Sequence, residues 1–85
     1  MANTTHLTSE QVESILNFAK QKVDAAFIME LKQDKHSNNF HVRLKGLNGE
    51  IMMHQETTTK QNAEHTAARI INGGLNAKYK DTTNE

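Results

Sequence analysis

The sequence predicts an α+β domain in the order α-β-β-β-α, with a three-stranded antiparallel sheet and two helices packed on one face. Three features predict this class. Apolar residues recur at helical spacing from about residue 9, an Asn-Gly pair separates two alternating segments, and a second helical pattern ends at two glycines. A chain of 85 residues has room for one hydrophobic core, so we expect one domain.

The first helix is expected over residues 9–22. Thr8 precedes it and Gln11 follows three residues later, which is the pattern of a capping box and indicates where the helix begins. Apolar side chains then recur along one face of the helix and should pack on the core. They are Val12, Ile15, Leu16, Ala19 and Val23.

Three strands are expected in the middle of the chain. Apolar and polar side chains alternate in each, so one face of every strand should pack on the core and the other should meet solvent. The polar segment "QDKHSNN" between the first two is rich in turn-forming residues and predicts a loop. The strands should cover residues 26–32, 39–46 and 50–56.

Asn48 and Gly49 predict a tight hairpin between the second and third strands. This dipeptide suits a two-residue type I′ turn, and such a turn fixes the strand register. The register places the side chain of Ile51 in the core. The expected pairs are Leu44 with Met53, Gly46 with Ile51, and Arg43 with His54.

The second helix is expected over residues 59–72. Thr57 and Thr58 are candidates for its N-cap, and Gly73 and Gly74 should end it. Its core-facing residues should be Ala63, Ala67, Ile70 and Ile71.

Residues 8–75 should form the folded domain. The polar segments 1–7 and 76–85 lack periodicity and are expected to be disordered. The expected core consists of Val12, Ile15, Leu16, Ala19, Phe27, Met29, Leu31, Phe40, Val42, Leu44, Ile51, Met53, Ala63, Ala67 and Ile70.

Composition excludes several classes of protein. The sequence has no cysteine, hence no disulfide, no thiolate zinc site and no thiol nucleophile, and this favours a cytoplasmic location. Its apolar stretches are far shorter than the ~18 residues of a membrane span, and no export signal precedes them. We therefore expect no contact with a membrane.

The histidines do not predict a metal or catalytic site. None of the five forms the i, i+4 pair typical of a zinc-binding helix, and only His41 and His54 should be neighbours, on an open sheet face without a pocket. We expect no metal, no cofactor and no catalytic residue, so the protein should not be an enzyme.

Charge is balanced overall but not along the chain. Ten Lys and Arg residues match ten Asp and Glu residues, which argues against strong nonspecific binding of nucleic acid. Residues 31–48, however, hold Lys32, Lys35, Arg43 and Lys45 against Asp34 alone. The predicted hairpin is therefore the basic part.

Two polar ends of the predicted fold could contact duplex RNA. His36 lies in the first strand loop and Lys60 in the first turn of the second helix, so both could lie on one side with the first helix. The minor grooves and phosphates of A-form RNA can be read at such spaced points. His36 would reach the minor groove and Lys60 the phosphates.

The segments "HSNNF" and "TKQNAEHTAARII" resemble the double-stranded RNA-binding domain family, over about residues 10–75. The resemblance implies a small binding module for double-stranded or structured RNA. Asp34 and Lys35 replace the usual Gly-Pro, and Gln61 and Glu64 replace lysines, so binding should be weak and salt-sensitive. The implied RNA-binding residues are His36, Lys35, Lys60, Gln61, Gln11, Ser14 and Gln21.

The segments "FHVRLKGLNGEI" and "TTTKQNAE" are similar to a second family, the YegP-like small bacterial proteins of unknown function. That resemblance implies a β-β-β-α unit that pairs in tandem or as a dimer, and it implies no activity. The alternative function is then protein interaction or homodimerisation through the exposed sheet face. The residues of that face would be Ile28, His41, Arg43, Met52 and His54.

Overall fold

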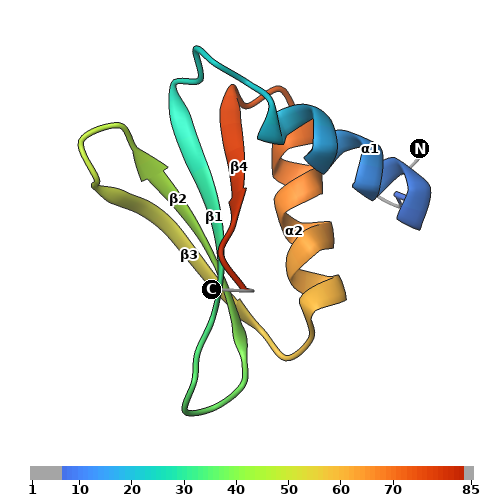
Figure 1. Ribbon diagram of the computed structural model, residues 1–85, viewed down its shortest axis with the longest axis vertical. Coiled ribbons are helices and arrows are strands. Elements are labelled where there is room, and N and C mark those ends of the chain that lie inside the picture. Colours follow the sequence, from blue (N-terminus) through green and yellow to red (C-terminus); the bar gives the residue numbers. More distant parts are fainter. Residues whose placement is uncertain (1–6, 84–85) are drawn as a thin grey trace.

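A computed structural model describes residues 7–83 of the chain. Two helices lie on one side of a four-stranded mixed sheet, whose strand order is β3-β2-β1-β4 (Figure 1). The expectation for residues 1–6 lies outside the described residues. The elements are α1 (Ser9–Lys20), β1 (Phe27–Gln33), β2 (Phe40–Gly46), β3 (Ile51–Thr57), α2 (Lys60–Asn72) and β4 (Ala77–Asp81).

Threonines cap the N-termini of both helices. The predicted capping box of α1 is confirmed, because the Thr8 hydroxyl accepts the Gln11 amide at 3.1 Å and the Gln11 side chain accepts the Thr8 amide at 2.9 Å. For α2 the expected caps were wrong, since Thr59 accepts the Asn62 amide at 3.1 Å. The strand before α2 continues to Thr57, which is still paired with β2, and the helix starts correspondingly later.

The β2–β3 hairpin has a longer turn than Asn48 and Gly49 predict. The Gly49 amide donates to the Gly46 carbonyl at 3.0 Å, and the Gly46 amide donates to the Glu50 carbonyl at 2.8 Å. Gly49 has a φ of 89°, so it supplies the left-handed residue that such a three-residue turn requires. The expected two-residue type I′ turn was therefore wrong, although both residues lie at the tip.

A β-bulge at Met52 restores the expected pairing of β2 with β3 beyond this turn. The expected pairs Leu44 with Met53 and Arg43 with His54 are confirmed, but Ile51 pairs with Lys45 rather than Gly46. The extra residue turns the Ile51 side chain away from the core, and it is 51% exposed. Its predicted place in the core was wrong for this reason.

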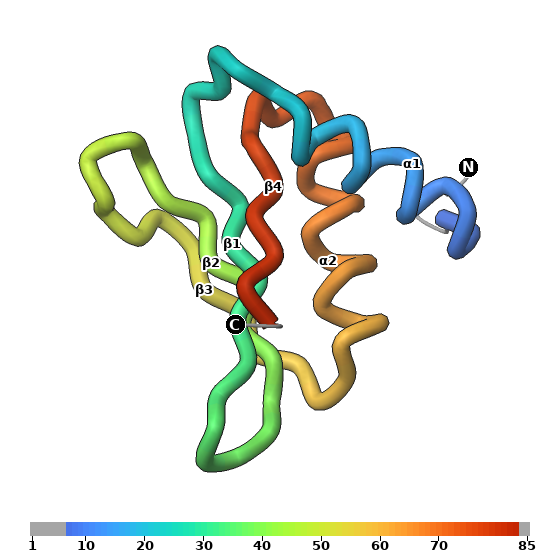
Figure 2. Tube along the Cα trace, in the orientation of Figure 1, coloured from blue at the N-terminus to red at the C-terminus, as the bar shows by residue number. Residues whose placement is uncertain are grey.

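A fourth strand completes the sheet. β4 pairs in parallel with β1, from Phe27 opposite Ala77 to Leu31 opposite Asp81. The three-stranded antiparallel sheet was thus an incomplete prediction, and residues 77–81 are ordered rather than part of a disordered tail. In Figure 2 this last segment of the trace lies beside β1, on the side of the sheet nearest α1. The side chains of Ala77 and Tyr79 are buried there and pack the strand against the core.

The core lies between the sheet and the helices. Small residues on α2 let its backbone approach the strands closely, where Met29, Leu31 and Val42 are fully buried. Six expected core residues pack only partly buried against this centre. Val23 lies beyond the end of α1 and is exposed, so the predicted apolar stripe was one residue too long. The buried core is Val12, Leu16, Ala19, Met29, Leu31, Val42, Ala63, Ala67, Ala68, Ile71, Ala77 and Tyr79.

Neither of the two helices described is long and apolar enough to cross a membrane.

Candidate functional site

The sheet face opposite the helices collects positive charge from β1, β2 and β4. Side chains alternate along a strand, so the neighbours of buried Met29, Leu31, Val42 and Tyr79 project from this open face. We call it the basic face. It carries five cations, two carboxylates and two histidines, an excess of three positive charges in a chain of zero net charge. They are Lys32, Arg43, Lys45, Lys78 and Lys80, with Glu30, Glu56, His41 and His54.

Most of these cations have no acidic partner. The Lys45 amino group lies 3.1 Å from the Glu30 carboxylate at the centre of the face, and this ion pair compensates for the partial burial of that carboxylate. The other four cations make no ion pair within residues 7–83. Lys35 joins them from the β1–β2 loop, because it lines a hollow of about 330 Å³ together with Lys32 and Lys80. The face is therefore suited to hold an anion.

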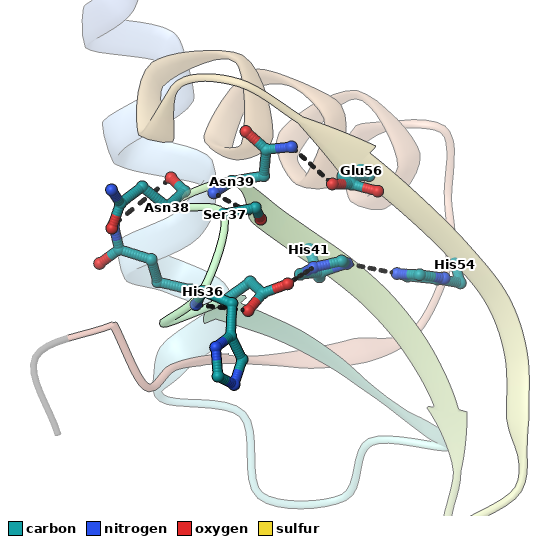
Figure 3. A network of polar contacts seen from close by, with 9 residues as sticks. His36, Ser37, Asn38, Asn39, His41, His54 and Glu56 are labelled. Atoms are coloured by element: carbon teal, nitrogen blue, oxygen red, sulfur yellow. Dashed lines mark hydrogen bonds and ion pairs between the residues drawn. The ribbon is translucent and has the colours of Figure 1, made fainter.

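Two stacked histidines lie on the β3 side of the basic face. His41 Nδ1 is 2.6 Å from His54 Nε2, and the ring centroids are 4.8 Å apart (Figure 3). Which of the two nitrogens donates and which accepts depends on the tautomers of the rings. Among residues 7–83 no group of three or more metal-ligating side chains is close enough to hold an ion. The pair is thus a planar polar contact surface.

The loop at one end of the basic face is held by Asp34. Its carboxylate accepts the His36 amide at 2.9 Å and lies 3.7 Å from His41 Nε2. The hydrogen bond from the His36 backbone is the main reason that the pKa of Asp34 is lowered. Asn39 extends the network to Glu56 of β3, with 2.6 Å between the amide nitrogen and the carboxylate (Figure 3). His36 itself is exposed.

The structure does not gather the residues expected to bind duplex RNA through the helices. Gln11 and Ser14 line a shallow hollow with Asn72, the last residue of α2, whereas Lys60 is its first residue. Thirteen helical residues, about 18 Å from first to last, separate the two sites. Gln61 follows Lys60, and Gln21 caps the far end of α1.

Lys60 is also engaged within the fold. Its amino group lies 3.4 Å from the Asp81 carboxylate of β4. Burial alone would raise the pKa of Asp81, but hydrogen bonds from Thr83 and the charge of Lys60 outweigh it, and the pKa is lowered. The carboxylate is therefore ionised and neutralises the lysine that was expected to contact phosphates.

A second hollow, of about 360 Å³, lies between α1, α2 and β4. Glu13, Lys20, Glu64 and His65 line it, and the Tyr79 ring forms part of its wall. Burial, followed by the charges of Asp81 and Glu64, raises the pKa of Tyr79 above its usual value, so the phenol stays protonated. Its hydroxyl is buried with no hydrogen-bond partner in the part of the chain that the structure describes.

Four of the five residues of the alternative surface share one face. Ile28 and Arg43 join the two histidines on the open side of the sheet, as alternation predicts, whereas Met52 is exposed but lies in the bulge, where alternation is interrupted. Sequence analysis missed Lys78 and Lys80, which belong to β4. The segment "AKYKD" does indicate a strand, because apolar and basic residues alternate in it and two residues separate it from a helix-ending Gly-Gly pair.

Comparison with protein-family models, with curated proteins and with solved structures found no match to this chain. The resemblances to double-stranded RNA-binding domains and to YegP-like proteins therefore stay predictions.

Proposed function

We propose that this chain is a non-enzymatic module that binds the phosphate backbone of structured RNA through its basic face. The observation that carries the proposal is the set of five cations on one open sheet face, four of them without an acidic partner among the described residues. Lys and Arg contacts to phosphates supply most of the affinity of nonspecific nucleic-acid binding. The low overall charge implies weak, salt-sensitive binding.

The composition of the basic face favours a polyanion over a protein partner. Cores of protein interfaces are enriched in aromatic residues and depleted of lysine. The basic face has four lysines and no Phe, Tyr or Trp. Its cations are spread over the three neighbouring strands β2, β1 and β4, about 4.8 Å apart, which presents them as a flat array rather than a pocket. A phosphate backbone lying across the strands would meet several of them together.

This proposal moves the contact from the helices to the sheet. Lys60 is neutralised by Asp81, and Gln11 and Ser14 of α1 lie at the other end of α2. Lys35 remains part of the proposed surface, because it lies beside Lys32 and Lys80. The stacked ring pair of His41 and His54 adds a planar group against which a sugar or base can rest.

A titration followed by NMR tests the location of binding. A duplex RNA of about sixteen base pairs, the span of a typical double-stranded RNA-binding domain, is added at low salt, with a single strand and a DNA duplex of the same sequence in parallel. We expect amide shifts on the outward positions of β1, β2 and β4. Shifts confined to α1, residues 34–38 and the start of α2 would instead support binding through the helices, and no shifts would reject RNA.

Two lysine substitutions separate the two routes. Lys80→Ala removes an exposed cation of the basic face, and Lys60→Ala removes the helix lysine that Asp81 already neutralises. The basic-face route predicts weaker binding for Lys80→Ala and little change for Lys60→Ala. The reverse order would contradict the proposal.

A further inference from the structure

The two edges of the sheet differ in how they are protected. β4 is short and carries two lysines in five residues, which is a common way to prevent an edge from pairing with another chain. β3 has seven residues, no lysine and no proline, and its single charged residue is Glu56. Its edge faces away from β2 and pairs with no other strand among residues 7–83. The β3 edge is therefore open to intermolecular pairing.

We propose that two copies of this chain pair antiparallel along their β3 edges, with Gln55 of each copy facing Gln55 of the other. The bulge at Met52 distorts the first part of the strand, which leaves residues 53–57 as its regular part. The midpoint of that part is Gln55. A two-fold axis there makes the longest regular ladder that two copies of β3 can form.

The side chains brought together by this register are compatible. His54 faces Glu56 of the second copy, and the two-fold axis repeats the contact, so an imidazole lies opposite a carboxylate in both halves. Met53 faces Thr57 on the helix side of the sheet. No two like charges are opposed. The same construction on β4, centred on Tyr79, would set Lys78 against Lys80 and repel.

The pairing also extends the open sheet. An antiparallel pair about a two-fold axis normal to the sheet keeps the same face outward in both copies. The result is an eight-stranded sheet with both helical layers on one side and both basic faces on the other. The dimer does not depend on the proposed RNA binding, but it would double the cations that one polyanion could meet.

Cross-linking through Gln55 tests the register directly. The chain has no cysteine, so Gln55→Cys introduces a single thiol on an exposed side chain, and a facing antiparallel pair brings two such residues within disulfide distance. The control is Gln61→Cys, a glutamine on α2 that is also exposed. With oxidised glutathione and no RNA, we expect Gln55→Cys to form a covalent dimer several times faster than Gln61→Cys. Equal rates would overturn the proposal.

Sedimentation supplies the second measurement. The unmodified chain should show a concentration-dependent shift from monomer to dimer, and Gln55→Lys, which sets two lysines face to face, should move it toward monomer. Gln61→Lys, which makes the same change on α2, should leave it unaltered. A monomer at every concentration, or a dimer that Gln55→Lys does not weaken, would show that β3 does not pair with its own copy. Both measurements are made without RNA, so their outcome is separate from that of the proposed function.

Discussion

Removing the two lysines of β4 should change the salt dependence of RNA binding by a calculable amount. Counting the strand residues alone, the basic face offers at most five phosphate contacts: Arg43 and Lys45 on β2, Lys32 on β1, and Lys78 and Lys80 on β4. At about 0.9 released counterions per contact, the logarithm of the binding constant should fall against the logarithm of salt concentration with a slope of about −4.5. Raising salt from about 50 to 200 mM then weakens binding about 500-fold.

The double variant Lys78→Ala/Lys80→Ala leaves three cations on the face. Its slope should be about −2.7, and the same rise in salt should weaken binding only about 40-fold. Both side chains are exposed, so the strand and the core should remain. Fluorescence anisotropy of a labelled duplex RNA at several salt concentrations measures the slope, with Lys60→Ala as the control that should leave it unchanged. An unaltered slope in the double variant would refute the assignment of phosphate contacts to β4.

Three further predictions concern the fold that carries the face. Tyr79→Phe should raise the free energy of unfolding in urea by about 1 kcal/mol, because it removes a buried hydroxyl without a partner in the described chain; a loss of stability would mean that the hydroxyl is bonded. Asp81 has a pKa below the usual 3.8 in the fold, so its ionised form stabilises the protein above that pH and the contribution is lost as pH falls through the lowered value. When the pH falls from 6 to 2, the free energy of unfolding should therefore decrease less for Asp81→Asn than for the unmodified chain. Unfolding curves at the two pH values measure both decreases, and equal decreases would contradict this. Gly49→Ala should cost about 1–2 kcal/mol, measured by thermal unfolding, because φ is 89° while no atom crowds the added methyl group; a neutral effect would argue against the left-handed turn.

Local signals predicted the helices and the antiparallel strands well. The capping box at Thr8 and the glycines after Asn72 act within a few residues of the ends they determine, so they could be recognised in the sequence. The alternation of β1 and β2 likewise reports directly which side chains face the core. Arg43, His41 and His54 could be placed on the open face for the same reason.

The parts that could not be predicted depend on longer-range or finer effects. β4 has only two core-facing side chains, Ala77 and Tyr79, and its pairing with β1 depends on a strand fifty residues earlier. The bulge at Met52 follows from a turn one residue longer than the Asn-Gly pair suggested, and it reversed the side of Ile51. Lys60 was expected to be free because its partner, Asp81, was assigned to a disordered tail.

The parallel pairing of β4 with β1 also determines when the basic face exists. Phe27 and Ala77 are fifty residues apart in sequence, whereas Leu44 and Met53 of the local hairpin are nine apart. Closing the longer loop costs about 1.5 kcal/mol more in chain entropy. β4 should therefore join the sheet late in folding and leave it early in partial unfolding, and amide hydrogens of β4 should exchange faster than those of β2. Each such opening removes two of the five cations, so the fully assembled face is present only while the least local strand pairing of the sheet is formed.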